Sequence, residues 1–176
     1  HTAKLLNHYG IKKPLFSFYR EKEREKAGKL LTIIKEGQDV ALVSDAGTPG
    51  ISDPGTFLVE KAVDAGIKII PIPGPAAFLL ALSASGLPTD RFVFEGFLPK
   101  KGKERRRRLR VLQAEERTLV FYEAPHRLKE TLNDLRDSFG PERRITIARE
   151  LTKIYEEFWR GTLENAVAEW EKREIK

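Results

Sequence analysis

Residues 40–55 read VALVSDAGTPGISDPG. The first five, VALVS, are nearly all apolar, which is typical of a strand buried on both faces of a parallel sheet. The loop that follows holds three glycines, two prolines and two aspartates. In open α/β sheets, ligands bind beyond the carboxyl ends of strands, and glycines there let a ligand approach backbone amides closely. This stretch therefore predicts an α/β fold with a ligand-binding loop at a strand end.

A second loop of this kind, PGPAA at 73–77, follows the next predicted strand, 67–72. Neither loop has the lysine of GxxxxGK[ST] or the spacing of GxGxxG. Acids and free amides without a cation suit a ligand with hydroxyl and ammonium groups better than a polyphosphate. The alternative is that both loops are tight turns that need glycine, the first with a capped helix behind it.

Helix and strand patterns alternate around these loops. Before them we expect a helix at 2–9, a strand at 15–19 and an amphipathic helix at 21–36. Asp53 as N-cap and Pro54 at the first helical position predict a helix that runs to residue 65, and a helix to residue 85 follows the second loop. After a linker at 85–89, strands are predicted at 92–97, 119–122, 145–149 and 154–161, with helices at 104–114, 128–138 and 163–172. The last two strands should form a hairpin, so we expect an α/β domain at 1–87 and a mixed α/β domain at 88–176.

Composition excludes several classes of protein. The 176 residues include no cysteine, which excludes disulfide scaffolds, cysteine-ligated zinc and thiol catalysis. Only three histidines occur, without HxxxH or HExxH spacing, so no metal site is expected. Apolar runs are too short to span a bilayer and no signal-peptide pattern is present, so we expect a cytoplasmic protein.

The positive charge is concentrated in one segment. Residues 100–110 read KKGKERRRRLR, with eight basic residues and one acid, whereas the whole chain carries a net charge of +6. The rest of the chain is therefore nearly neutral, and the run predicts a polyanionic partner bound through phosphate contacts. Four successive arginines sweep most of the way round a helix whose core side is marked by Leu109 and Leu112. The alternative is a solvated helix with extended arginine stems.

Three polar clusters end predicted strands in the second half: EGFLPK at 95–100, YEAPHR at 122–127 and ARELTK at 148–153. They combine acids, bases and phosphate-binding cations. Each also has an ordinary structural interpretation. His126 and Arg127 could begin a helix after Pro125, and Glu150 with Lys153 could form a surface ion pair worth under ~1 kcal/mol.

The segments SDAGTPGISDPG, PIPGPAA, FEGFLPK, FYEAPHR and ARELTK follow one another in an order and spacing that resemble the tetrapyrrole methylase superfamily. More narrowly, they resemble its ribosomal RNA branch, the small-subunit rRNA cytidine-2′-O-methyltransferases. The resemblance implies two α/β domains of the class III methyltransferase type, with S-adenosylmethionine in the cleft between them, and a homodimer. The family also has a first strand with a GTPIGNL-type loop and a last strand of EFVLVIEG type, and neither is found in this sequence.

The resemblance also implies roles for individual residues. Cofactor contacts would come from Asp45, Ala46, Gly47, Pro49, Gly50, Ser52, Asp53, Pro75, Ala76, Ala77, Phe97, Tyr122 and Ala148. Apart from the resemblance, the basic run itself predicts RNA contacts at Lys100, Lys101, Lys103, Arg105, Arg106, Arg107, Arg108 and Arg110. The candidates near the proton of the reacting hydroxyl are Lys100, Glu123, His126, Arg149 and Glu150. Among these we expect Lys100 and Arg149 to orient phosphate or stabilise an alkoxide, and Glu123 or Glu150 to be a base or an orienting group.

Two other functions are compatible with parts of the sequence. A precorrin-type methylase of the same superfamily would not need eight clustered cations for a small macrocycle. A non-catalytic RNA-binding protein would keep the basic run but would have no reason to carry two glycine- and proline-rich loops at strand ends.

Overall fold

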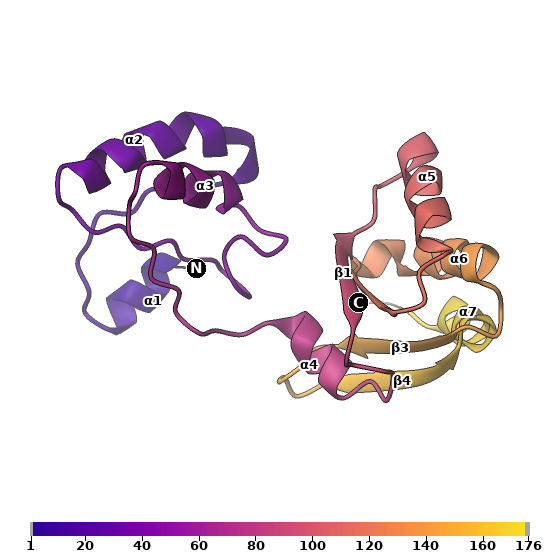
Figure 1. Ribbon diagram of the computed structural model, residues 1–176. Helices are drawn as coiled ribbons and strands as arrows, with labels where there is room; N and C mark the ends of the chain where they lie inside the picture. Colours follow the sequence, from indigo (N-terminus) through magenta and orange to yellow (C-terminus); the bar gives the residue numbers. More distant parts are fainter. Residues whose placement is uncertain (1, 175–176) are drawn as a thin grey trace. The chain divides into compact units, whose positions relative to one another are not determined.

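The computed structural model describes residues 2–174 and divides into two units, His1–Ala76 and Ala77–Lys176 (Figure 1). The sequence placed a domain boundary at 87/88. The difference arises from helix α4 (Ala77–Ser83), whose Phe78 ring stacks on Phe94 with 4.3 Å between centroids. This helix therefore packs with the second unit, and the division of the chain into domains 1–87 and 88–176 stays a prediction.

The first unit is helical in its described residues. It contains α1 (Thr2–His8), the short 3₁₀ helix η1 (Arg20–Lys22), α2 (Glu23–Lys35) and α3 (Thr56–Asp64). Helices α2 and α3 pack together through buried Ala27 and Leu30 on one helix and Leu58 on the other. Partly buried aromatic and aliphatic side chains from the same helices and from Phe18 surround this small core.

Helix α3 is capped by a residue from another helix. The expected cap was Asp53, but α3 begins at Thr56 with Gly55 as N-cap and no capping side chain of its own. Glu23 Oε1 of α2 instead accepts from Gly55 N at 2.9 Å and from Phe57 N at 3.0 Å. A carboxylate at a helix N-terminus satisfies free amides and complements the helix dipole. Gly55 adopts φ of 137°, and a Cβ there would meet Leu42 at 2.7 Å, so glycine is required.

The strands expected at 15–19, 40–44 and 67–72 are wrong for this structure. Within residues 2–76 none of these segments forms a ladder. Apolar side chains that a sheet would bury remain in solvent, with Val43 54% and Ile70 67% exposed. A strand forms only where a partner strand completes its backbone hydrogen bonds. An apolar pattern shows that a segment could lie in a sheet, but it does not specify a partner strand.

The second unit contains two pairs of strands. β1 (Phe92–Phe97) runs parallel to β2 (Thr118–Tyr122), and α5 (Gly102–Leu112) connects them. β3 (Arg144–Arg149) and β4 (Glu157–Thr162) form the expected antiparallel hairpin, and η2 (Pro125–Arg127) and α6 (Leu128–Phe139) precede it. β4 starts later than predicted because 150–156 form a turn, with Glu150 and Thr152 at φ of 51° and 65°. Helix α7 (Leu163–Lys172) follows β4, and this mixture of helices and strands confirms the expected α/β class.

The core of the second unit lies between its helices and strands. Its buried members are Leu98, Leu109, Leu112, Leu132, Leu135, Leu163, Ala166 and Trp170. Burying a large apolar side chain stabilises a fold by about 1.5–3 kcal/mol, so this cluster fixes α5, α6 and α7 against the strands. In the part of the chain that the structure describes, no helix is long and apolar enough to cross a membrane.

Candidate functional site

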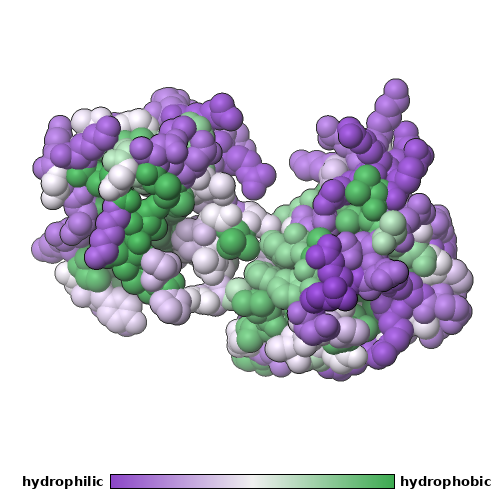
Figure 2. Space-filling view, viewed as in Figure 1, coloured by the Kyte–Doolittle hydropathy of each residue, from purple (hydrophilic) through white to green (hydrophobic). Residues whose placement is uncertain are grey.

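Helix α5 presents a face of cations to solvent. Lys103, Arg106, Arg107 and Arg110 are exposed and spaced i, i+3, i+4 and i+7, which places them on one side of a helix. Leu109 and Leu112 on the other side are buried in the core. Within residues 2–174, none of the four cations forms an ion pair. We call these four residues the cation face; Figure 2 shows hydrophilic side chains covering the region where Figure 1 draws α5.

Arg105, which we expected among the RNA-binding residues, is buried in the second unit. Its residue is 4% exposed, and its guanidinium donates to Asp134 Oδ2 at 2.5 Å, Thr131 Oγ1 at 2.8 Å and the Pro99 carbonyl at 3.0 Å. The burial has a simple cause, because Arg105 lies four residues before Leu109 and seven before Leu112, on the core side of α5. The sequence contained this signal, since the two leucines already marked that side.

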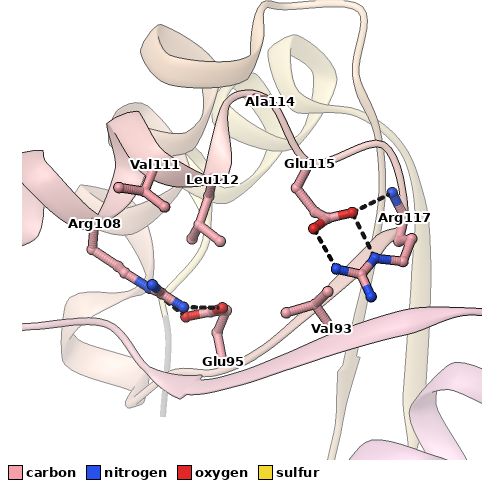
Figure 3. Close-up of a pocket in the computed structure, with 8 residues that line it drawn as sticks. All are labelled: Val93, Glu95, Arg108, Val111, Leu112, Ala114, Glu115 and Arg117. Carbon is pink, nitrogen blue, oxygen red and sulfur yellow. Dashed lines mark hydrogen bonds and ion pairs between the residues drawn. The ribbon is translucent and has the colours of Figure 1, made fainter.

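Arg108 is also paired, with Glu95 of β1. Its Nε donates to Glu95 Oε2 at 2.7 Å and its Nη2 donates to Oε1, a bidentate pair that raises the pKa of the guanidinium. The pair borders a hollow of about 310 Å³ lined by Val93, Glu95, Arg108, Val111, Leu112, Ala114, Glu115 and Arg117 (Figure 3). This hollow could not be predicted from the sequence, because residues 93–95 and 108–117 meet only when α5 folds over β1.

Glu123 is held by a buried network at the end of β2. Its side chain is 8% exposed; Oε1 accepts from Ala124 N at 2.8 Å and lies 3.4 Å from Arg127 Nε, and Oε2 accepts from Thr131 Oγ1 at 2.6 Å. Arg127 in turn donates to the Leu98 carbonyl at 2.9 Å. Thr131 joins Glu123 to Arg105, so the strand end and α5 share one network of hydrogen bonds.

The other catalytic candidates lie in different surroundings. Arg149 Nε donates to Glu157 Oε2 at 2.7 Å, and Arg173 and Arg149 together lower the pKa of Glu157. Glu150 accepts from Lys153 Nζ at 3.0 Å on the exposed turn after β3. Lys100 and His126 are exposed, and Lys100 has no ion-pair partner within residues 2–174. No hydrogen bond or ion pair in the described chain joins the cluster at 122–127 to the one at 148–153.

The two glycine-rich loops of the first unit meet. Thr48 Oγ1 donates to the Pro75 carbonyl at 2.8 Å across 27 residues of sequence. Gly47 and Gly50 adopt φ of 72° and 80°, and Ser52 adopts 55°, so the loop turns sharply around Thr48. Asp45 and the rest of this loop remain largely in solvent. Thr48 was not among the expected site residues, although it lies between Gly47 and Pro49.

The aromatic candidates gather at the carboxyl end of β1 and β2. The rings of Phe97 and Tyr122 lie 5.6 Å apart, and Phe97 is 53% exposed. Tyr122 also contacts Phe94 edge to face at 5.1 Å. Two further cofactor candidates are alanines: Ala148 pairs with Phe158 in the β3–β4 hairpin, and Ala77 begins α4.

Within residues 2–174, no group of three or more His, Cys, Asp or Glu side chains is arranged to hold a metal ion.

Comparison with known proteins identifies related sequences over nearly the whole chain. Residues 3–167 match the family model described as Tetrapyrrole (Corrin/Porphyrin) Methylases. The proteins called Ribosomal RNA small subunit methyltransferase I of Synechocystis and of Thermotoga maritima are 54% and 48% identical over 96% and 98% of this chain, and the matches cover 60% and 77% of their own lengths. That of Pseudomonas aeruginosa is 55% identical over 89% of this chain and 55% of its own length.

A solved structure is similar as well. The match to the crystal structure of the methyltransferase CobJ has a TM-score of 0.65 and 27% sequence identity, and covers 87% of this chain and 68% of that one. Among the sequence relatives, the chain spans about 60% of the length of the first curated proteins that it matches.

Proposed function

Because the chain belongs to the tetrapyrrole methylase family, we propose that it carries out S-adenosylmethionine-dependent methylation of small-subunit ribosomal RNA, at the 2′-hydroxyl of a cytidine. The rRNA methyltransferases related to this chain at about 50% identity support the rRNA substrate. The observation that carries the proposal within this structure is the cation face of α5.

The cation face suits a chain of phosphates. Its four side chains are exposed and without ion-pair partners in the described chain, whereas Arg105 and Arg108 of the same helix are neutralised by Asp134 and Glu95. Guanidinium groups form paired hydrogen bonds with phosphate oxygens. Lys100 and Lys101, just before the helix, extend the same exposed positive charge.

The two loops of the first unit fit the cofactor's polar groups. The joined loops carry Asp45 and Asp53 and no lysine or arginine, so carboxylates and backbone amides are available to ammonium and hydroxyl groups. We propose that the cofactor contacts Asp45, Ala46, Gly47, Pro49, Gly50, Ser52, Asp53, Pro75 and Ala76 in this unit, and Ala77, Phe97, Tyr122 and Ala148 in the second. When bound, the cofactor supplies a methyl group on a positively charged sulfur.

The hydrogen bonds and ion pairs of the catalytic candidates suggest a different role for each of them. Both carboxylate oxygens of Glu123 already accept hydrogen bonds, so we assign it to holding the end of β2 in place. Glu150 is exposed, and within residues 2–174 its carboxylate pairs only with Lys153, which leaves it able to accept a proton from a sugar hydroxyl. Lys100 and Arg149 are cations that can orient a phosphate or stabilise a developing alkoxide. Positioned acid–base groups typically contribute ~10²–10⁴-fold to such a reaction.

The role of the cation face is tested by the salt dependence of RNA binding. We expect a variant with Arg106, Arg107 and Arg110 all changed to Gln to bind small-subunit rRNA less tightly. The slope of log affinity against log salt should flatten by roughly 2, because each lost phosphate contact on a single strand removes about 0.7. The measurement is fluorescence anisotropy with labelled rRNA fragments between low and moderate salt.

A charge-matched control uses Lys12, Lys13 and Lys35, three exposed lysines of the first unit, all changed to Gln. This control should keep the parent slope. Equal flattening in the two triple variants would show that only net charge matters, and an unchanged slope in the α5 variant would exclude the cation face as the phosphate-binding surface.

A further inference from the structure

The hollow beside α5 combines an apolar floor with two neutralised arginines. Val93 of β1 and the nearly buried Leu112 of α5 line its base, and Val111 is 59% exposed at its edge. The Arg108–Glu95 and Arg117–Glu115 pairs lie on opposite sides, with Leu112 between them (Figure 3). Its volume of about 310 Å³ is at the lower end of the range for ligand pockets, about 300–1,000 Å³.

Both guanidiniums are held edge-on by a carboxylate. Arg117 Nε and Nη2 donate to the two oxygens of Glu115 at 2.8 and 2.7 Å, and Arg108 makes the same kind of bidentate pair with Glu95. Each pair fixes the plane of its guanidinium and consumes the edge that would otherwise bind a phosphate. The side chains of Arg108 and Arg117 remain 44% and 45% exposed, and planar rings stack on exposed guanidinium faces.

The hollow adjoins the cation face on the same helix. Val111 follows Arg110 directly, and Arg108 follows Arg107, so the hollow and the cation face occupy neighbouring sides of α5. It lies toward the amino ends of the parallel pair, near Val93 and Arg117, whereas Phe97 and Tyr122 lie at the carboxyl ends. The hollow is therefore separate from the strand-end residues proposed for methyl transfer.

We propose that the hollow receives one unstacked base of the RNA strand whose phosphates lie along the cation face. The inference rests on the proposed RNA partner and adds a second mode of contact to it. A nucleobase is planar, has apolar faces and polar edges, and brings no charge of its own, which matches an apolar floor between neutralised arginines. Unstacked bases that pack on aromatic rings or on arginine planes are a general mode of RNA recognition.

The test compares probes that differ only in their bases. The full chain is titrated with an oligocytidine octamer and with an abasic octamer of the same phosphate backbone, at several salt concentrations. We expect the octamer with bases to bind at least about fivefold more tightly at equal salt, since one stacked base contributes at least this much, while the salt slopes agree.

Filling the hollow should remove the preference for bases. Val111 and Ala114 are both changed to Leu, which adds volume inside the hollow and no charge. The matched control changes Val63 on α3 and Ala168 on α7, which are also exposed, to Leu. We expect the filled variant to bind the two octamers equally with an unchanged salt slope, and the control to keep the preference. Arg117→Gln should reduce the preference too, whereas Arg91→Gln, another exposed arginine, should not.

The outcomes separate this inference from the proposed function. Salt-dependent binding without any preference for bases in the parent would overturn the base site and leave the cation face intact. A filled variant that keeps the preference would place the base elsewhere. A filled variant that loses binding only to assembled small subunits would mean that a protein side chain occupies the hollow, which also overturns the inference. No salt-dependent binding of either octamer would overturn both proposals.

Discussion

Neighbouring arginines on α5 have opposite roles. Arg105 points into the core and its guanidinium donates to two segments, α6 and the Pro99 carbonyl before α5, whereas Arg106 is exposed and unpaired within residues 2–174. The run of four arginines could be located from sequence alone, but the pairing of Arg105 with Asp134 and of Arg108 with Glu95 could not. A single residue, or about 100° of rotation around the helix, separates a structural arginine from an exposed one.

Replacing Arg105 should therefore destabilise the fold. We expect Arg105→Met to lower the free energy of unfolding by ~3 kcal/mol, because it removes the buried arginine of the ion pair with Asp134, the donor to Thr131 and the nearer of two donors to the Pro99 carbonyl. Arg106→Met should change it by less than about 0.5 kcal/mol. Urea unfolding followed by tryptophan fluorescence reports this directly, because Trp159 and Trp170 both lie in the second unit. Equal stability of the two variants would contradict the buried role of Arg105.

The Glu115–Arg117 pair has a consequence at low pH. Hydrogen bonds from Arg117 lower the pKa of Glu115 to about 2, below its ordinary value near 4.3. A lowered pKa means that the pair stabilises the fold above the ordinary pKa and that this contribution is lost as the pH falls toward 2. We expect the NMR chemical shift of the Glu115 side-chain carboxyl carbon to titrate with a midpoint near pH 2. In Arg117→Gln the midpoint should return to about 4.3; a midpoint near that value in the parent would exclude the pair.

The strands of this protein differ in how well the sequence predicts them. β1, β2 and the β3–β4 hairpin follow the predicted strands closely, since each finds its partner within the second unit. The segments 40–44 and 67–72 carry equally apolar patterns and form no ladder in the described chain. The hollow and the network around Glu123 were also beyond prediction, because they join residues that the fold brings together from separate elements. Loop positions, in contrast, were predictable: Thr48 joins the two glycine-rich loops that the sequence singled out.

The cap of α3 can be tested at the level of the helix. Glu23→Ala should destabilise the first unit by ~1 kcal/mol, because the amides of Gly55 and Phe57 lose their acceptor. Glu25→Ala, an exposed acid in the same turn of α2, serves as the control. Amide hydrogen exchange should show faster exchange at Phe57 in Glu23→Ala alone. If the two variants exchange alike, the interhelical cap does not contribute to stability.

At the scale of the whole molecule, the family relationship and the charge distribution lead to the same proposal. The family supplies methyl-transfer chemistry, and the cation face supplies a surface for a long polyanion. Neither alone separates RNA from a tetrapyrrole as substrate. Their combination favours RNA, because the cation face spans about two turns of α5 and continues into the exposed Lys100 and Lys101. If Glu150 accepts the proton of the sugar hydroxyl, Glu150→Gln should slow methyl transfer at least about tenfold at saturating cofactor. This corresponds to an increase of about 1.4 kcal/mol in the activation barrier.

The most direct test of this account is single-turnover methyl transfer by the full-length protein. Small ribosomal subunits and their free rRNA, both from cells that lack the enzyme, are incubated with S-adenosylmethionine labelled in its methyl group, alongside free precorrin-type tetrapyrroles. We predict that label enters rRNA, is recovered as 2′-O-methylcytidine after nuclease digestion, and does not enter the tetrapyrroles. Label in the tetrapyrroles and none in rRNA, or no transfer to any of these substrates, would contradict the central claim.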